Sequence, residues 1–277
     1  MKRRLDLSDG MAVVTGASSG IGRALAVALA ERGSDLALVG RNADGLAETA
    51  RQCGAVTVSQ HVLDVTDADG VAALPQSVLD AHGRATVLVN NAGGSIVGRV
   101  DEVSDEELRW LFDVNFFAIT ALTRAFLPVL LAQPQASIAN MSSMFGLLAP
   151  AEQAAYVATK FAVRGWSESL RHELDGTGVA VTVIHPGGVK TDIAKSSRVA
   201  AAADPVQAAV SMERFEEHVL RLSPERAAEI IVRAIERRRP RVLVGADVRA
   251  ADLLQRAAPG RYWLAIRSQV RKLTADG

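Results

Sequence analysis

The stretch VVTGASSGIGRALA, residues 13–26, decides the fold of this chain. It opens with apolar and β-branched residues, carries glycines at positions 16, 20 and 22, and ends in alanine and leucine. This order predicts a buried strand, a tight turn and a helix. Glycines let the backbone approach a ligand closely, and a helix N-terminus presents unpaired N–H groups to an anion. The stretch therefore predicts a dinucleotide site, although a glycine-rich turn without a ligand has the same pattern.

Strand-like and helix-like segments alternate along the rest of the chain. Short β-branched runs that read as strands occur at residues 11–16, 35–40, 55–65, 85–93, 136–143, 179–188 and 241–246. Longer alanine- and leucine-rich segments lie between them, and we expect helices over about 149–175 and after Pro224. This alternation predicts an α/β fold, a Rossmann-type doubly wound parallel sheet of about seven strands with helices on both faces.

The chain of 277 residues fits one such domain with a tail. We expect a single NAD(P)-binding domain over residues 1–245, a C-terminal extension over 246–277, and an irregular substrate lid over about 190–222.

Composition excludes several classes of function. The 31 basic and 31 acidic residues balance, which argues against nucleic-acid binding. The single cysteine and five scattered histidines predict no disulfide and no metal site. The basic N-terminus lacks the apolar region of a signal peptide, so we expect a cytoplasmic protein. The apolar run 116–132 is interrupted by Arg124 and Pro128 and is interpreted as a helix buried on most sides, not as a membrane span.

The end of the second expected strand indicates which dinucleotide binds. Asp35 begins that strand, so it lies about 16 Å from the end where cofactors bind, at about 3.3 Å per residue. Arg41 follows the strand instead, and its guanidinium suits a 2′-phosphate, which favours NADP(H) over NAD(H). A solvated loop arginine is the other reading. Asp64 and Val65 could hold an adenine, or Asp64 could cap a helix.

Together the motifs resemble the short-chain dehydrogenase/reductase family. They are TGASSGIG from Thr15 to Gly22, NNAG from Asn90 to Gly93, Asn115 in DVNFFA, Ser143 in NMSSMFG, YVATK from Tyr156 to Lys160, and HPGGVKTDI from His185 to Ile193. The resemblance covers about residues 9–245 and implies an NAD(P)-dependent oxidoreductase acting on an alcohol or a carbonyl compound.

The resemblance also implies residue roles. Tyr156 is the acid/base, Lys160 activates it, Ser143 lies 13 residues before the tyrosine, and the main chain of Asn115 holds a relay water. The implied cofactor contacts are Gly16, Ser18, Ser19, Gly20, Ile21, Gly22, Arg41, Asp64, Val65, Asn91, Ala92, Gly93, Tyr156, Lys160, Pro186, Gly187, Val189 and Thr191.

Elementary chemistry agrees with these roles. Tyrosine titrates near pH 10, and an ammonium one helical turn away is expected to lower that pKa. Ser143 can donate a hydrogen bond to a carbonyl oxygen as negative charge develops there. Taken alone, a Tyr/Lys pair is surface decoration and Ser143 a cap; His185 and Cys53 are assigned to structure. The alternatives are an NADP-sensing or scaffold protein without turnover, and an epimerase or dehydratase.

Apolar residues beside these motifs predict a pocket for a hydrophobic ketone or secondary alcohol. They are Ile96, Val97, Phe145, Leu147, Leu148, Ile193, Met212 and Phe215. The apolar helices 105–131 and 150–174 resemble the pair through which the family forms homodimers and homotetramers. The extension mixes aromatic and basic residues, so it either contacts an anionic membrane surface, packs across the subunit or closes over a neighbour's pocket.

Overall fold

Seven parallel strands form the central sheet, in the order β3-β2-β1-β4-β6-β7-β9. The structure, a computed structural model, describes residues 4–191 and 197–267. The strands are β1 (Met11–Thr15), β2 (Asp35–Gly40), β3 (Val58–Val62), β4 (Val87–Asn90), β6 (Ala136–Met141), β7 (Val179–Pro186) and β9 (Arg241–Val244). The order reverses between β1 and β4, where ligands of such sheets bind beyond the carboxyl ends of the strands. The predicted doubly wound sheet is confirmed.

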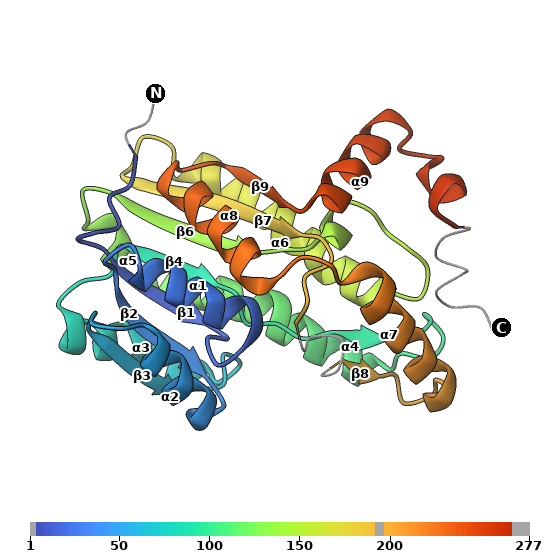
Figure 1. The fold of residues 1–277 in the computed structure, drawn as a ribbon, viewed down its shortest axis with the longest axis horizontal. Helices are drawn as coiled ribbons and strands as arrows, with labels where there is room; N and C mark the ends of the chain where they lie inside the picture. Colours follow the sequence, from blue (N-terminus) through green and yellow to red (C-terminus); the bar gives the residue numbers. More distant parts are fainter. Residues whose placement is uncertain (1–3, 192–196, 268–277) are drawn as a thin grey trace.

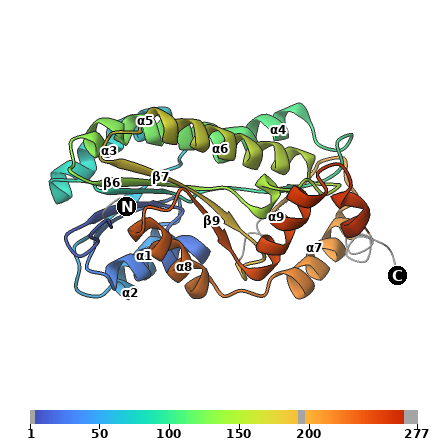
Figure 2. The same ribbon diagram turned by 90° about the horizontal axis from the view of Figure 1, so that it is seen from above.

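Helices cover both faces of the sheet, as Figure 2 shows. One face carries α1 (Gly20–Ala30), α2 (Ala43–Gln52) and α8 (Pro224–Glu236); the other carries α3 (Ala68–His82), α4 (Asp105–Phe112), α5 (Ala118–Leu131) and α6 (Ala154–Glu173). Alternate residues of β1 explain the two cores, because Val14 packs towards α1 and α8 while Val13 packs towards α3 and α5. Both faces are buried, which is why the strands are apolar without alternation.

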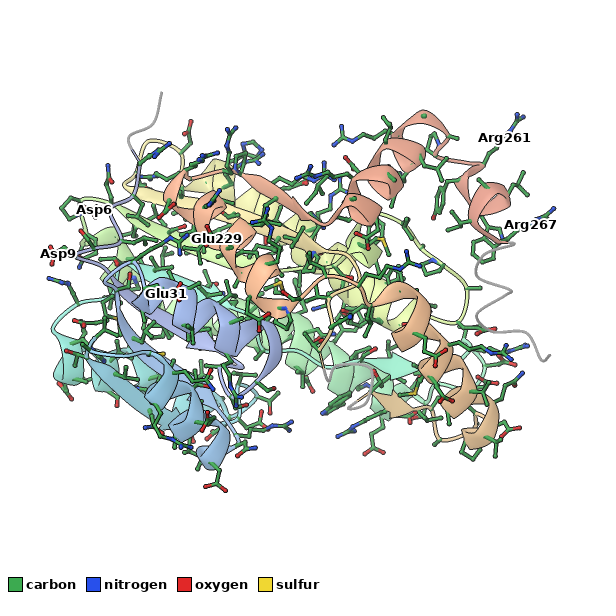
Figure 3. The ribbon with its side chains drawn as sticks, viewed as in Figure 1. Asp6, Asp9, Glu31, Glu229, Arg261 and Arg267 are labelled. Atoms are coloured by element: carbon green, nitrogen blue, oxygen red, sulfur yellow. The ribbon has the colours of Figure 1, made fainter. Side chains whose placement is uncertain are left out.

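Salt bridges join the two central helices of one face. Arg32, at the end of α1, places Nη2 2.7 Å from a Glu229 oxygen and Nε 2.9 Å from a Glu236 oxygen, both carboxylates belonging to α8. Glu229 lies between these helices in Figure 3. This contact holds α8 against α1, and α8 also packs on β7 and β9.

Side-chain caps fix where several helices begin. Asn42 caps α2, Asp67 caps α3 and Ser223 caps α8, while Ser104 and Glu107 form a capping box at α4. Each cap satisfies a backbone N–H that the first helical turn leaves without a partner. Asp64 is therefore not the helix cap that one reading of the sequence expected.

The region between residues 190 and 222 contains regular structure. Helix α7 (Pro205–Val219) begins where Asp204 accepts hydrogen bonds from the N–H groups of Val206 and Gln207. Strand β8 (Arg198–Val199) pairs with β5 (Ile96–Val97) in a separate two-stranded sheet. The expectation of an irregular lid was wrong for this part, because an aspartate before a proline is a strong helix start. Residues 192–196 lie outside the described residues.

The other expected helices also differ in detail. Helix α6 begins at Ala154, not near residue 149, because Glu152 has a left-handed φ of 65° that no helix accommodates. A short 3₁₀ turn, η2 (Met144–Gly146), precedes it.

The long apolar helix is divided. Between α4 and α5 lies a π-helical segment, η1 (Asp113–Phe117). Within the described residues, Asp105–Leu131 is the one helical stretch long and apolar enough to span a membrane, with a mean hydropathy of 1.7. Leu122, Phe126 and Leu130 are buried against the sheet, whereas Phe117 and Leu131 are exposed. The helix is thus buried along one side only, and not on most sides as the sequence predicted. The core helix of a soluble protein can be as long and as apolar as a membrane span.

The C-terminal extension packs on its own chain. Helix α9 (Ala246–Ala257) follows β9, and Asp252 pairs with Arg241 at 2.5 Å. Farther on, the hydroxyl of Tyr262 accepts a hydrogen bond from the N–H of Ala149 at 3.0 Å. Arg261 and Arg267 point away from the body of the molecule (Figure 3). Helix α9 thus lies beside β9 and η2, at one end of the sheet (Figure 1).

Candidate active site

The glycine turn after β1 leaves the first N–H groups of α1 without a side-chain cap. Gly16 and Gly20 have φ values of 66° and 54°, which side chains with a Cβ rarely adopt. Ser19 precedes the helix in extended conformation and its side chain makes no capping hydrogen bond. A helix N-terminus of this kind suits an anionic ligand. The backbone N–H groups of this turn are therefore suitable hydrogen-bond donors to the pyrophosphate of a dinucleotide.

The end of β4 packs directly against this turn. The hydroxyl of Thr15 accepts hydrogen bonds from the N–H groups of Asn91 and Ala92, both at 3.0 Å. In return, the Asn91 amide donates to the Thr15 carbonyl oxygen at 2.9 Å. The predicted cofactor residues of the two segments are thus brought together at the β1–β4 switch point.

Arg41 follows the end of β2 and pairs with Asp64. Its side chain is 74% exposed, and Nη1 lies 3.6 Å from a carboxylate oxygen of Asp64. Asp64 also accepts hydrogen bonds from the N–H and hydroxyl of Thr66, at 3.0 and 2.8 Å. Burial raises the pKa of Asp64, but the Thr66 hydrogen bonds and the Arg41 charge together lower it below its usual value. Asp35 is confirmed at the far end of the strand, where it accepts from the Thr57 N–H.

Tyr156 and Lys160 are both buried on α6. Their exposures are 9% and 4%, so they are not the surface pair that the bare spacing allowed. The Lys160 ammonium lies 5.4 Å from the centre of the Tyr156 ring and donates to the Met141 carbonyl oxygen at 3.2 Å. Met141 ends β6, so α6 delivers both side chains to the carboxyl edge of the sheet.

Ser143 follows β6 and faces the same place. Its hydroxyl accepts a hydrogen bond from the Phe145 N–H at 3.1 Å, which is the capping role, and it also hydrogen-bonds the Tyr156 side chain. Nδ1 of His185, at the end of β7, donates to the Ser143 carbonyl oxygen at 2.9 Å. His185 is fully buried and burial lowers its pKa to about 4, so it stays neutral. The histidine assigned to structure thus holds the predicted catalytic serine.

Asn115 lies in the π-helical segment, fully buried. Its side chain accepts from the Gly94 N–H at 2.8 Å and donates to the Thr159 hydroxyl at 3.1 Å. A Cβ built on Gly93 would lie 2.9 Å from Asn115 Oδ1 and 3.5 Å from Lys160 Nζ. Gly93, Asn115 and Lys160 therefore meet at one point, and a side chain at position 93 would press on the Asn115 amide. π-Helical turns are frequent at functional sites, and no sequence pattern here announces this one.

The structure contradicts the expected pKa of Tyr156. Burial raises its pKa to about 12, a rise that the Ser143 hydrogen bond opposes. Burial also lowers the pKa of Lys160 to about 8. The ammonium therefore does not overcome the desolvation of the phenol, because both groups lie in a medium that disfavours their charged forms. At neutral pH Tyr156 is protonated and Lys160 is mostly charged.

The segment after β7 reaches the glycine turn. Thr191 Cγ2 would lie 3.3 Å from a Cβ on Gly20, so the two loops are in contact. Val189 bridges to Leu222, and the Gly188 N–H donates to Asp247 at 2.7 Å. Thr191 thus brings the end of this segment beside the β1 turn. Asp247, from the C-terminal extension, belongs to none of the sequence motifs, and its contact with Gly188 was not predicted.

The surroundings of Tyr156 mix apolar and polar character. Ile96, Leu111 and Ala200 form a buried cluster with Tyr156, and Phe145 packs edge-on to its ring with centroids 6.1 Å apart. Of the other expected lining residues, Leu147 and Leu148 are buried and Val97 lines a pocket; Ile193 and the side chain of Phe215 lie outside the described residues.

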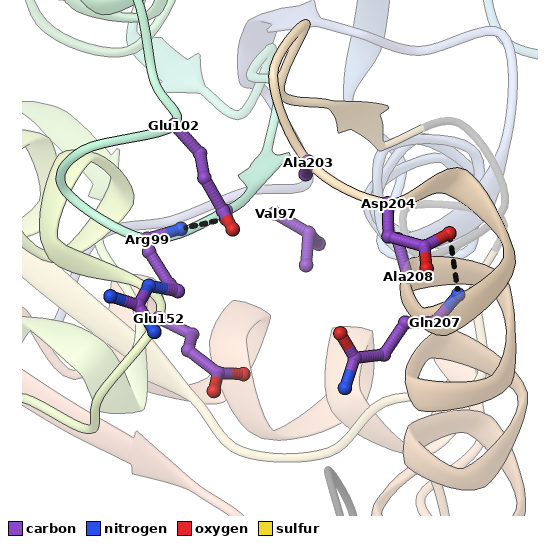
Figure 4. Close-up of a pocket in the computed structure, with 9 residues that line it drawn as sticks. Val97, Arg99, Glu102, Glu152, Ala203, Asp204, Gln207 and Ala208 are labelled. Atoms are coloured by element: carbon purple, nitrogen blue, oxygen red, sulfur yellow. Dashed lines mark hydrogen bonds between the residues drawn. The ribbon is translucent and has the colours of Figure 1, made fainter.

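That pocket, beside this cluster, is mainly polar. It lies between β5, the loop before α6 and the start of α7, and Arg99, Glu102, Glu152, Asp204 and Gln207 line much of it (Figure 4). The expected lining of this side is therefore only partly apolar.

Three kinds of contact hold strand β8 in place: backbone pairing, a stacked arginine and a hydrogen bond to a glutamate. Its pairing with β5 is extended by Ala200 N–H donating to the Val97 oxygen at 2.9 Å. Arg198 stacks on Trp110 of α4, with its guanidinium carbon 3.6 Å from the ring centre. Ala201 N–H donates to Glu107 at 3.0 Å. Neither Trp110 nor Arg198 carries a motif that marks this role.

Comparison with known proteins gives a consistent picture. A model of the short chain dehydrogenase family matches residues 10–202. The putative oxidoreductase SadH of Mycobacterium tuberculosis is 40% identical over 266 residues, 95% of each chain.

Solved structures agree with this match. A short-chain dehydrogenase/reductase from Burkholderia phymatum, in complex with NAD, superposes with a TM-score of 0.85 at 30% identity, covering 92% of this chain and 95% of the other. An alcohol dehydrogenase from the archaeon Thermococcus sibiricus, complexed with 5-hydroxy-NADP, gives 0.72 at 29% identity, covering 84% and 95%. With the glycine turn, the buried Tyr/Lys pair and the sheet order, these matches show that the chain belongs to the short-chain dehydrogenase family and is a nicotinamide-dependent oxidoreductase.

Proposed function

We propose that this enzyme interconverts a carbonyl compound and a secondary alcohol with NADP(H), and that Tyr156 is its acid/base. The observation that carries the proposal is the convergence of Ser143, Tyr156 and Lys160, from the end of β6 and from α6, at the carboxyl edge of the sheet close to Gly93. Two elements, β6 and α6, thus bring a proton donor, a hydrogen-bond donor and a positive charge to one place.

Reduction of a carbonyl needs a hydride on carbon and a proton on oxygen. The bound nicotinamide supplies the hydride, with its electron pair. Tyr156, protonated at neutral pH, donates the proton to the carbonyl oxygen. Ser143 donates a hydrogen bond to that oxygen, and Lys160 stabilises the phenolate that forms. In the reverse direction Tyr156 takes the hydroxyl proton, so the same groups serve oxidation.

The preference for NADP(H) rests on charge at the end of β2. Arg41 is exposed there, held 3.6 Å from Asp64, and Asp35 lies at the opposite end of the strand. A guanidinium at the end of β2, with the acidic residue of this strand at its other end, favours a 2′-phosphate. The apolar cluster around Tyr156 supports a substrate with a hydrophobic body. Exposed Phe117, Leu131 and Phe161 on the outer faces of η1, α5 and α6 support association into homodimers or homotetramers.

The test is NADPH oxidation followed by absorbance, with a panel of ketones, diketones and quinones. Tyr156→Phe should lose turnover by about 10²–10⁴-fold, the usual contribution of a general acid. Equal turnover in this variant and the wild type contradicts the mechanism. Binding of NADPH with no turnover of any substrate points instead to a sensing or scaffold role.

Cofactor preference is tested in the same assay. Arg41→Ala should lower kcat/KM for NADPH relative to NADH by about tenfold, the loss of one charge-assisted contact. Arg51→Ala is the matched control, since Arg51 is also 74% exposed but lies at the end of α2 and pairs with Glu48. A wild-type enzyme that prefers NADH contradicts the reading of Arg41.

A further inference from the structure

The C-terminal extension places a carboxylate against the segment that follows β7. Asp247 lies in the first turn of α9 and accepts the Gly188 N–H at 2.7 Å through Oδ2. Both its carboxylate oxygens would overlap a Cβ built on Gly187, so this position has room only for a glycine. A hydrogen bond from a backbone N–H to an ionised carboxylate is stronger than a neutral one. The extension is therefore packed directly onto the Gly187–Gly188 backbone.

The other polar groups of this short segment are held from different elements. The N–H of Gly187 donates to the Val244 carbonyl oxygen of β9 at 2.9 Å. The carbonyl oxygen of Gly188 accepts the N–H groups of Arg221 and Leu222, each at 3.0 Å. Asp247 supplies the contact to the Gly188 N–H. With these contacts in place, the orientation of the peptide planes between Pro186 and Val189 is fixed on both sides.

A second contact docks the extension independently of Asp247. Asp252, on the same helix, is 15% exposed and pairs with both Arg241 and Arg256, at 2.5 and 3.1 Å. Tyr262 reaches the loop before α6 through the Ala149 N–H. Loss of the Asp247 carboxylate therefore leaves α9 attached to the domain, and its local effect on Gly188 can be separated from undocking.

We propose that Asp247 is a positioning residue for the nicotinamide end of the cofactor. It holds the Gly187–Gly188 backbone in the orientation that presents Pro186 to Thr191 to the nicotinamide carboxamide. The proposal rests on the proposed binding of the nicotinamide by this segment. It assigns the C-terminal extension a part in cofactor binding, and it confines that part to one end of the dinucleotide.

Calorimetric titration with two ligands tests this division. NADP⁺ carries the nicotinamide, whereas 2′-phospho-ADP-ribose carries the adenine, both ribose units and the phosphates but no nicotinamide. Asp247→Ala should weaken NADP⁺ binding about tenfold, the usual loss for a hydrogen bond to a charged group, and leave 2′-phospho-ADP-ribose affinity unchanged. Asp247→Asn, whose amide oxygen still accepts the Gly188 N–H, should restore most of the loss.

Asp252→Asn is the matched control. It breaks the pairs that dock α9 and is expected to lower the melting temperature without changing the ratio of the two affinities. Equal losses for both ligands in Asp247→Ala, or no loss for either, overturn the proposal, as does an Asn variant as weak as the Ala variant. If the Ala variant does not fold, Asp247→Asn and Asp247→Glu are compared instead. The longer glutamate misplaces the carboxylate, so an unchanged NADP⁺ affinity in Asp247→Glu refutes the positioning role. A wild type that binds neither ligand refutes the proposed function itself.

Discussion

Replacing Lys160 with methionine should make the protein more stable at neutral pH while it removes turnover. The ammonium is 4% exposed, with one hydrogen bond to the Met141 carbonyl oxygen, and burial lowers its pKa from 10.5 to about 8. Because the folded protein binds this proton less tightly than the unfolded chain does, the charged lysine lowers the free energy of unfolding at every pH where it is protonated. Methionine has a similar length and carries no charge.

The size of the effect follows from the pKa shift. A shift from 10.5 to about 8, at about 1.4 kcal/mol per unit, corresponds to a cost of about 3 kcal/mol. The substitution also removes the hydrogen bond to the buried Met141 carbonyl oxygen, which reduces the gain in stability by about 1 kcal/mol. The net gain of about 2 kcal/mol should raise the melting temperature by about 4 °C in a chain of this size.

The dependence on pH identifies the cause. Below about pH 8 lysine is charged in both states and its cost is complete. Between about 8 and 10.5 the unfolded chain binds a proton that the folded chain does not, so the wild type gains stability as pH rises. The advantage of Lys160→Met should thus be largest below pH 8 and disappear towards pH 10.5.

Thermal unfolding of both proteins from pH 6 to about 10 measures this difference. Lys190→Met is the matched control, because Lys190 is exposed and its replacement should shift the melting temperature little and equally at every pH. A variant at Lys160 that is less stable than the wild type at pH 7, or whose advantage is the same at every pH, refutes the reasoning.

Two further substitutions test the site. Gly22→Ala should destabilise the fold by about 2 kcal/mol, because the methyl group would clash with the Gly16 carbonyl oxygen and lie 2.6 Å from Asn91 Nδ2. Gly165→Ala in α6 is the control, because its methyl group would meet nothing within 4 Å and should stabilise the fold by up to about 1 kcal/mol. Equal melting temperatures for the two variants would contradict the packing argument. His185→Leu should lower kcat by about 10- to 100-fold without changing cofactor affinity, since it releases the Ser143 carbonyl oxygen. His185→Asn can keep the donor near the position of Nδ1 and should recover activity; equal kcat in the Leu variant and the wild type would show that Ser143 needs no such support.

The strands and the glycine turn were predictable because each is encoded locally. β-Branched runs between alanine-rich helices place the seven strands, and the glycines at 16 and 20 are needed where φ is positive. Arg41 and Asp35 could be placed because strand direction alone separates the two ends of β2. The convergence of Tyr156, Lys160 and Ser143 needed the family motif, since the spacing by itself favours a surface pair.

Other features depend on contacts that no local pattern encodes. The pKa of Tyr156 is governed by burial, which is a property of the assembled domain and not of its distance from Lys160 along the helix. Asp247 meets Gly188 across 59 residues of sequence, through the docking of α9. Helix α7, in contrast, is encoded locally, because Asp204 and Pro205 mark its start. The prediction of a lid without regular structure did not take this signal into account.

The stacking of Arg198 on Trp110 gives the protein an optical signal for the position of β8. The guanidinium carbon lies 3.6 Å from the ring centre, and Gly94 lies close to the edge of the indole. Withdrawal of β8 would expose that ring to water and shift its fluorescence to longer wavelength. Trp166 belongs to α6 and packs against the core on that face of the sheet, and Trp263 belongs to the C-terminal extension, so neither is part of the Arg198–Trp110 stack. With those two replaced by phenylalanine, the emission of Trp110 would report whether β8 stays packed on α4, with no dye attached.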